Sequence, residues 1–156
     1  MTPSVACVVD ASVGIKLFLA EELSDRADAL FAHLAADPPG QFSVPDLFYI
    51  ECANILCKHT RRSGYPPEKA RKALTDLGGL ALRRFPTADL AVQALDVAVQ
   101  KAITAYDACY VALAFQLSLP FVTADEKLAR ALSGTKHQVR WLGDFPIPPN
   151  PPQAAN

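Results

Sequence analysis

The amino-acid sequence predicts an α/β protein built around a mainly parallel, doubly wound sheet. Short apolar runs alternate with amphipathic helical patterns along the chain, and this alternation is typical of strand–helix units that feed a parallel sheet. Two of the apolar runs, "CVVD" and "FVTAD", end on a carboxylate, at Asp10 and Asp125. Because the carboxyl ends of parallel strands lie at one edge of the sheet, we expect a ligand site there.

The first half of the chain is predicted to contain two strands and four helices. In chain order these are a strand at about 6–9, a helix from about residue 13, a helix that starts after residue 24, a strand at 41–45, and helices at about 46–62 and 67–77. The second of these helices carries its apolar residues at helical spacing and ends before Pro38. Ser63 and Gly64 end the third helix, and Pro67 suits the first turn of the fourth. The strands of this half are therefore joined by helices, as parallel pairing requires.

The second half is predicted to contain three more strands and three helices. In chain order these are a strand at 80–85, a helix from residue 87 or 88 to about 101, a helix at 105–118, a strand at 120–125, a short helix at 126–132 and a last strand at 138–142. The stretch "FPIPPNPPQAAN" that follows is too rich in proline to join a helix or a central strand. We therefore expect one domain over residues 1–145 and a proline-rich tail over 146–156.

The composition indicates a folded domain rather than a disordered chain or a membrane protein. Hydrophobic residues make up 51% of the 156 residues and charged residues 20%, which suffices for a core without disulfides. The sequence contains neither a secretory signal nor an apolar run long enough for a bilayer, so we expect a cytoplasmic protein with no membrane association. Its four cysteines lie among apolar neighbours and are interpreted as reduced core thiols: Cys7, Cys52, Cys57 and Cys109.

The charge balance limits how the chain could bind a polyanion. The formal net charge is −1, so the chain lacks the basic excess of a protein that binds nucleic acid by charge alone. A nucleic acid would have to meet local basic groups or a bound cation. The basic candidates are Lys16, Lys58, Arg61, Arg62, Arg83 and Arg84.

Four carboxylates are candidates for one shared site. Asp10 and Asp125 end two of the predicted strands. Glu51 lies about one turn into the helix after the second strand, and Asp107 lies near the start of the helix before the "PFV" strand. Asn54 is three residues beyond Glu51 and shares its helix face. Each acid alone has a structural alternative, because an acid at a helix N-terminus caps the helix or interacts favourably with its dipole.

A converged set of acids favours a divalent cation. Carboxylates in one cleft repel one another and raise each other's pKa values unless something positive is bound. A set of acids, amides and waters suits Mg²⁺ or Mn²⁺ rather than Zn²⁺, because hard cations prefer oxygen ligands. Such a site usually serves phosphate chemistry, in which the ion neutralises charge that builds on the phosphate during in-line attack.

Four sequence motifs together resemble those of PIN-domain nucleases, and most closely the VapC-like ribonuclease toxins of bacterial toxin–antitoxin pairs: "VVDAS", "PDLFYIECANIL", "AYDA" and "FVTADEKLARAL". The resemblance runs from about Val8 to Leu142, with every motif in family order. It implies a three-layer α/β/α sandwich around a mainly parallel sheet of about five strands. It also implies cleavage of RNA phosphodiester bonds with Mg²⁺ or Mn²⁺, a homodimer, and inhibition by a small VapB-like antitoxin chain.

The resemblance also implies roles for individual residues. The catalytic and metal-binding acids would be Asp10, Glu51, Asp107 and Asp125. The polar neighbours that orient ligands, water or phosphate would be Ser12, Asn54 and Thr123. Glu126 is the alternative to Asp125, and we favour Asp125 because it repeats the strand-end position of Asp10.

Two other functions stay open on the sequence alone. The same metal chemistry cuts DNA. No motif in the sequence indicates recognition of the ribose 2′-hydroxyl that distinguishes RNA from DNA. A non-catalytic binding module of the same fold would keep the same acids. Metal-dependent turnover would exclude that second alternative.

Overall fold

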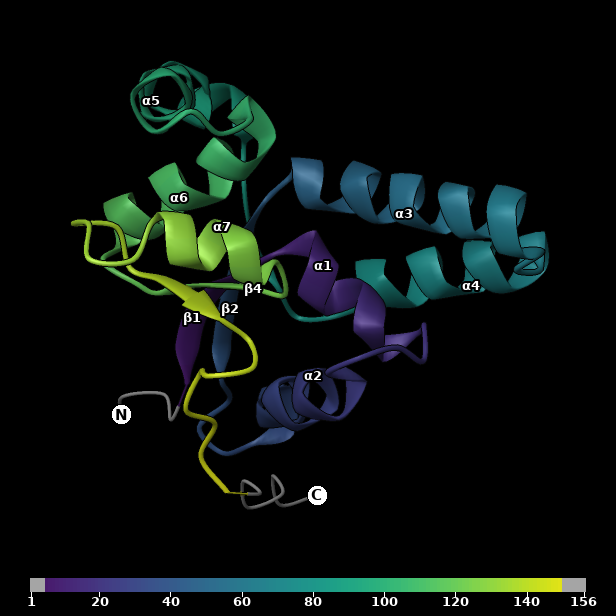
Figure 1. Cartoon of the computed structure of the whole chain (residues 1–156). Coiled ribbons are helices and arrows are strands. Elements are labelled where there is room, and N and C mark those ends of the chain that lie inside the picture. The colour runs from purple at the N-terminus through teal and green to yellow at the C-terminus, as the bar shows by residue number, and fades with distance from the viewer. Residues whose placement is uncertain (1–4, 150–156) are drawn as a thin grey trace.

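The computed structural model describes residues 5–149 and shows five parallel strands with helices on both sides (Figure 1). The strands are β1 (Ala6–Val9), β2 (Gln41–Pro45), β3 (Arg83–Phe85), β4 (Phe121–Thr123) and β5 (Val139–Trp141). Their order across the sheet is β3-β2-β1-β4-β5, and every neighbouring pair is parallel. The predicted parallel sheet of about five strands is confirmed.

The connections in the first half of the chain are helical, as predicted. β1 is joined to β2 by α1 (Ala11–Gly14), η1 (Ile15–Leu17), α2 (Ser24–Phe31) and η2 (Ala32–Ala35). β2 is joined to β3 by α3 (Leu47–Ser63) and α4 (Pro67–Gly78), which pack together as a hairpin that projects from the sheet (Figure 1). The helix expected from about residue 13 begins earlier, at Ala11, and makes a single turn before the 3-10 segment.

The second half adds the buried helix of the fold. β3 is joined to β4 by α5 (Thr87–Lys101) and α6 (Ala105–Leu117), and α7 (Glu126–Ala131) joins β4 to β5. α6 packs against β1, β2 and β4, while α5 packs against α6. All seven residues of 108–114 are therefore buried, as expected for a helix that is apolar all round.

The strand order places the helices in layers. From β1 the chain adds β2 and then β3 on one side of β1, and it then adds β4 and β5 on the other side. Because parallel crossovers are right-handed, this reversal puts the later helices on the opposite face from the earlier ones. In Figure 1 α6 and α7 lie to one side of the strands and α2 to the other. The result is the three-layer α/β/α arrangement that was expected.

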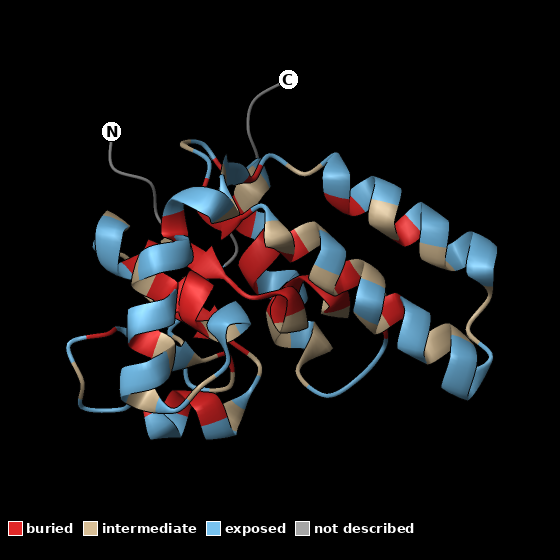
Figure 2. Cartoon of the chain, turned by 90° about the horizontal axis from the view of Figure 1, so that it is seen from above, coloured by how far each residue is buried: buried red, intermediate tan, exposed pale blue. Residues whose placement is uncertain are grey.

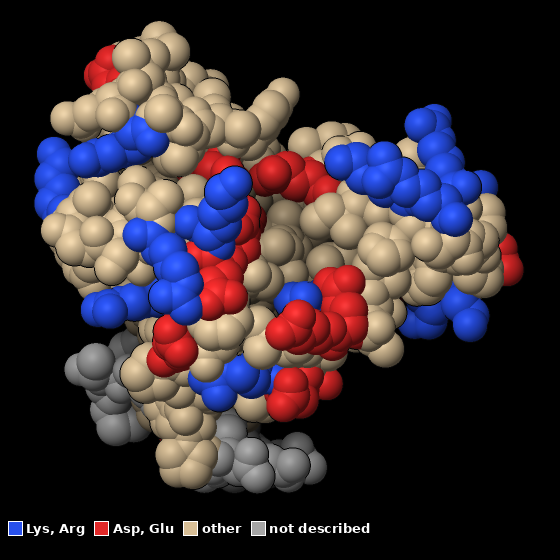
Figure 3. Space-filling view, in the orientation of Figure 1, with Lys and Arg blue, Asp and Glu red and all other residues tan. Residues whose placement is uncertain are grey.

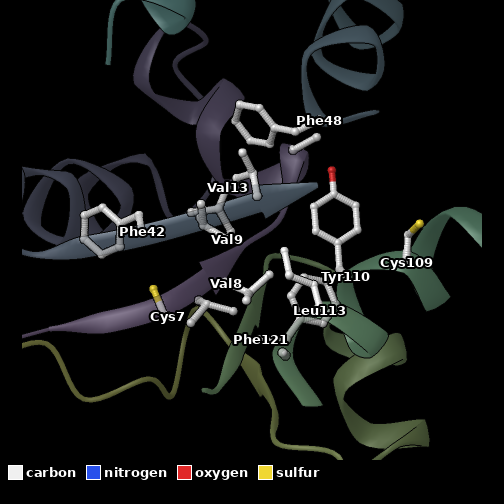
Figure 4. Close-up of a cluster of buried hydrophobic side chains, with 14 of the residues drawn as sticks. Cys7, Val8, Val9, Val13, Phe42, Phe48, Cys109, Tyr110, Leu113 and Phe121 are labelled. Carbon is white, nitrogen blue, oxygen red and sulfur yellow. The ribbon is translucent and has the colours of Figure 1, made fainter. Parts of the chain in front are cut away.

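The core lies between the sheet and its helices. Figure 2 shows burial concentrated in the strands and on the inward faces of the helices, while the α3–α4 hairpin is largely exposed. In the cluster of Figure 4, the rings of Tyr110 and Phe121 stack with centroids 5.2 Å apart. The predicted core thiols are confirmed for Cys7, Cys52 and Cys109, whereas Cys57 is exposed on α3 and that part of the prediction is wrong.

The C-terminal segment is held to the body of the domain as far as it is described. Phe145 and Ile147 pack against the core, and Nε2 of His33 lies 3.3 Å from the carbonyl oxygen of Pro148. Residues 150–156 of the predicted proline-rich tail lie outside the described residues. No helix within residues 5–149 is long and apolar enough to span a membrane.

Candidate active site

The strand topology brings two of the predicted acids to one edge of the sheet. β1 and β4 are hydrogen-bonded neighbours, with Val9 opposite Val122, and Asp10 follows β1 directly. Asp125 lies two residues beyond the end of β4. The chain reverses its direction across the sheet between these two strands, and open α/β proteins bind ligands at such a switch point.

Asp10 is almost fully buried, with 6% of its surface exposed. The hydroxyl groups of Ser12 and Thr123 both donate to its Oδ2, each over 2.8 Å. Asp10 occupies the N-cap position of α1, but its side chain makes no capping hydrogen bond, so the interpretation of Asp10 as a helix cap is wrong. Its carboxylate instead belongs to a network that joins the ends of β1 and β4.

The two hydroxyl groups are fixed by the backbone after β4. The Ser12 Oγ accepts a hydrogen bond from the amide of Ala124 over 3.1 Å, and the Thr123 Oγ1 accepts one from the amide of Asp125 over 3.0 Å. Each hydroxyl therefore accepts from a main-chain N–H and donates its own proton to Asp10. This contact pattern suits the predicted positioning role of Ser12 and Thr123.

Burial raises the pKa of Asp10 to about 6. The hydrogen bonds from Thr123 and Ser12 work in the opposite direction, and the charge of Asp107 raises the pKa further. Two donated hydrogen bonds thus compensate only part of the desolvation of this carboxylate.

Glu51 lies half-buried on the first turns of α3. The hydroxyl group of Tyr110 donates to its Oε1 over 2.7 Å, and in Figure 4 that hydroxyl points out of the apolar cluster. Burial raises the pKa of Glu51 to about 7; the Tyr110 hydrogen bond lowers it, and the charges of Asp10 and Asp107 raise it. Glu51 therefore shares one electrostatic environment with the acids at the sheet edge.

Tyr110 is a site residue that the sequence reasoning missed. Its ring is buried in the core, but its hydroxyl donates to Glu51. The available signal was its spacing, because Tyr110 lies three residues after Asp107 and so on the same face of α6.

Asp107 lies in the first turn of α6, where the side chain of Thr104 caps the helix by accepting from the Asp107 amide over 3.1 Å. Burial raises the pKa of Asp107, the hydrogen bond with Thr104 lowers it, and the charge of Asp125 raises it again. Asp107 thus links the buried Asp10 and the half-buried Glu51 to the exposed Asp125.

Asp125 caps α7, with its Oδ1 accepting from the amide of Leu128 over 3.0 Å. Its neighbour Glu126 forms an ion pair with Arg130 on the outer side of the same helix. The electrostatic contact with Asp107 is made by Asp125, which supports our preference for Asp125 over Glu126.

Asp46 is a third acid at the end of a strand, but it does not belong to the acid cluster. Asp46 follows β2 and accepts hydrogen bonds from the amide and hydroxyl of Thr87. These bonds lower the pKa of Asp46, whereas the pKa values of Asp10, Glu51 and Asp107 are raised. Asp46 therefore ties β2–α3 to the start of α5 and does not share the acidic environment.

Asn54, like Glu51 and Asp107, lies outside the hydrogen-bond network that joins Asp10 to Ser12 and Thr123. It is exposed on α3 and lines a surface hollow together with Glu51. Figure 3 shows acidic side chains gathered around a hollowed region between the α3–α4 hairpin and the α6–α7 side of the molecule.

The acids fit a hard divalent cation in charge and in donor chemistry. Within residues 5–149 none of the four carboxylates has a basic ion-pair partner, so their repulsion is uncompensated, and all the donors are oxygen atoms. In the described part of the chain no three His, Cys, Asp or Glu side chains are arranged to hold an ion as they stand. Ion binding would therefore require the carboxylates to turn toward one another.

Comparison with known proteins identifies relatives of this chain. A family model of the PIN domain matches residues 7–132. Ribonuclease VapC3 of Pyrobaculum aerophilum is 34% identical over 124 residues, which are 78% of this chain and 91% of that protein. Ribonuclease VapC9 of Mycobacterium tuberculosis is 31% identical over 122 residues, which are 78% of this chain and 87% of that protein.

Solved structures show the same architecture. The crystal structure of PAE2754 from Pyrobaculum aerophilum has a TM-score of 0.62 at 25% identity and covers 89% of this chain and 85% of its own. A chain of a toxin–antitoxin complex from Klebsiella pneumoniae has a TM-score of 0.59 at 16% identity. The match covers 86% of this chain and 95% of that one. The second likeness concerns the fold alone.

Proposed function

This chain belongs to the PIN-domain family, and on that basis we propose that it is a metal-dependent ribonuclease of the VapC type that acts as the toxin of a toxin–antitoxin pair. The observation that supports this function most is the set of four carboxylates at the topological switch point. Three of them have raised pKa values, and none has a basic partner within residues 5–149. The curated relatives that carry the name ribonuclease favour RNA over DNA as the substrate.

The proposed catalytic and metal-binding residues are Asp10, Glu51, Asp107 and Asp125, which would hold Mg²⁺ or Mn²⁺. When bound, the ion would neutralise charge on the scissile phosphate and make a coordinated water more acidic. Ser12 and Thr123 keep the Asp10 carboxylate oriented through their hydroxyl groups. Tyr110 does the same for Glu51 from the core side.

Proton transfer from the attacking water needs an acceptor near neutral pH. Glu51 is placed for this role, because its side chain is half-buried beside the other acids and accepts the hydrogen bond of Tyr110. The reaction is hydrolysis of a phosphodiester bond and forms no covalent enzyme intermediate.

Basic groups on α3 would hold the RNA backbone. Lys58, His59 and Arg62 line a shallow hollow on the outer half of α3, and Figure 3 shows Lys and Arg gathered over that end of the hairpin. Lys16 pairs with Glu21 over 3.0 Å, and Arg84 lies over the ring of Tyr49. Of the predicted basic candidates, those on α3 are therefore the most available for phosphates.

The proposal includes protein partners. The Klebsiella pneumoniae neighbour was solved as a toxin–antitoxin complex, which supports a VapB-like antitoxin as the partner of this chain. A homodimer and a cytoplasmic location remain predictions, as do the division at residues 145 and 146 and the positioning role of Asn54. Light scattering of the purified chain, alone and with its antitoxin, measures the oligomeric state.

Cleavage of a nucleic-acid panel tests the proposed function. The partner-free chain is incubated with transfer RNAs, other single-stranded RNAs and DNAs, in Mg²⁺, Mn²⁺ or chelator. We expect metal-dependent cutting of RNA, with a loss of at least about 100-fold in Asp10→Asn and Asp107→Asn. Asp96→Asn, which changes an exposed acid on α5, is the matched control and should retain activity.

Three outcomes would count against the proposal. Cutting of DNA but not RNA would identify a DNA-directed nuclease. Binding of Mn²⁺ without cutting of any substrate would favour a non-catalytic module. Equal activity in Asp10→Asn and wild type would exclude the acid cluster as the site.

A further inference from the structure

A surface hollow adjoins the acid cluster on the side of α3 and the start of α6. It has a volume of about 520 Å³ and is lined by Ile50, Glu51, Ala53, Asn54, Cys57 and Tyr106. Glu51 belongs both to this hollow and to the acid cluster, and Asp107 follows Tyr106 directly in the chain. A ligand in the hollow would therefore lie beside the position of the reacting phosphate.

Tyr106 gives the hollow an open aromatic wall. The side chain is 66% exposed, and within residues 5–149 it has neither a hydrogen-bond partner nor a ring contact. By contrast Phe115, the other exposed aromatic of α6, is covered by Lys136 at 5.3 Å and by His137 at 5.9 Å. A planar group can therefore approach the face of Tyr106 without displacing other side chains.

The remaining lining suits one flat, partly polar ring. Ile50 is 70% exposed and supplies apolar surface to the hollow. The amide of Asn54 offers one acceptor and two donors, and no hydrogen bond within the described residues uses them. Stacking surface and an amide beside an acidic catalytic centre match a nucleobase better than a phosphate, which the charge of Glu51 would repel.

We propose that this hollow binds a nucleobase next to the scissile phosphate, with Tyr106 stacking on the base and Asn54 contacting its edge. The assignment rests on the proposed ribonuclease function. It adds that Tyr106 and Asn54 determine which base is accepted. The base is held on the α3 side of the acids, while the lysine and arginine side chains farther along α3 contact the backbone. Tyr106 would thus set which nucleotide is placed at the cut.

The test combines protein and RNA changes in one cycle. The RNA that wild type cuts best is shortened to an oligoribonucleotide, and each nucleotide around the cut is replaced in turn by an abasic one. Tyr106→Leu keeps the apolar surface but removes the aromatic face, and Tyr106→Trp restores it. Phe115→Leu is the matched control, about 13.5 Å farther along the same helix.

We expect Tyr106→Leu to lower kcat/KM about 5- to 150-fold on the intact RNA, and Tyr106→Trp and Phe115→Leu to stay close to wild type. At one abasic position the difference between wild type and Tyr106→Leu should disappear, because the base that Tyr106 contacts is gone. Asn54→Asp should change the preferred base at that same position. A purely structural role of Tyr106 would lower activity equally on every RNA.

Other results would overturn the assignment, each in its own way. If wild type cuts RNA but Tyr106→Leu cuts all RNAs equally well, the hollow is not a base site. If Tyr106→Leu changes the oligomeric state in light scattering and leaves the abasic pattern unchanged, the surface is a contact between protein chains. If wild type cuts no RNA while binding Mn²⁺, the proposed function fails first and the base site fails with it.

Discussion

A buried carboxylate needs hydrogen bonds or a counter-ion, and Asp10 has two hydroxyl donors but no basic partner within residues 5–149. Both donors reach the same oxygen, Oδ2, and both are fixed by main-chain amides after β4. The carboxylate is therefore positioned by the protein while its charge is left uncompensated. Such an arrangement lowers the stability of the metal-free chain. Binding of a cation restores that stability.

Ser12→Ala removes one of the two donors to Asp10. We expect RNA cleavage at saturating Mg²⁺ to fall about 10- to 100-fold, because the hydroxyl of Thr123 still orients the carboxylate. Initial rates of cleavage measure this, with the exposed Ser133→Ala as control. A loss as complete as that of Asp10→Asn would show that Ser12 does more than position Asp10.

Tyr110→Phe keeps the ring stacked on Phe121 and removes the hydroxyl that donates to Glu51. That hydrogen bond lowers the pKa of Glu51, so its loss raises this pKa further above about 7. We expect the acidic limb of the pH–rate profile to move to higher pH, together with a loss of about 10- to 100-fold at pH 7. An unchanged profile at full activity would show that Glu51 does not limit the reaction.

The sequence predicted the positions of the site acids but not the directions of all their side chains. The acids were predictable because they stand at strand ends or helix starts whose positions follow from the hydrophobic pattern. The cap interpretation of Asp10 and the missed role of Tyr110 both concern side-chain direction, which spacing alone does not determine. Cys57 was misassigned for the same reason, since the apolar Ile55 and Leu56 precede it although its own side chain is exposed.

The elements were predictable where the chemistry is local. Pro67 begins α4 and Gly64, with φ +68°, ends α3, as the turn residues indicated. The first helix was placed too late because α1 starts directly after the Asp10 strand end and changes to a 3-10 segment after Gly14. α1 packs against α3 and β4, contacts that the local sequence pattern does not reveal.

Gly14→Ala tests the packing that places α1 against α3. An added Cβ would lie 2.7 Å from Cζ of Phe48 and 3.0 Å from its Cε2, so the buried ring would have to shift. We expect a decrease of about 1–3 kcal/mol in the free energy of unfolding, measured by urea titration. Gly78→Ala, where an added Cβ meets nothing within 4 Å, is the control, and equal effects of the two changes would contradict the packing argument.

The whole molecule carries a net charge of −1, and its acids are unevenly placed. Asp10 and Glu51 have pKa values raised to about 6 and about 7 from ordinary values of 3.8 and 4.5. The folded state therefore binds protons more tightly than the unfolded state between about pH 4 and pH 7. The contribution of these groups to stability is greatest below that window and is lost as the pH rises through it.

The pH dependence of unfolding tests this account without any substrate. In chelator, wild type should lose stability between about pH 4 and pH 7 relative to Glu51→Gln, whose side chain does not ionise. The matched control, Glu68→Gln, changes an exposed glutamate on α4 and should follow wild type. If Glu51→Gln and wild type lose stability in parallel, Glu51 is not destabilised by burial and neighbouring acids.

The most direct measurement of the central claim is the affinity for Mn²⁺ of wild type, of the amide variants of Asp10, Glu51 and Asp107, and of Asp96→Asn, by isothermal titration calorimetry at pH 7. If the acids form one cation site, wild type and Asp96→Asn bind Mn²⁺ alike, and each of the other three changes weakens binding at least about 10-fold. If Mn²⁺ binds equally well to all of them, or to none, the acids do not form a metal site and the proposed chemistry is wrong.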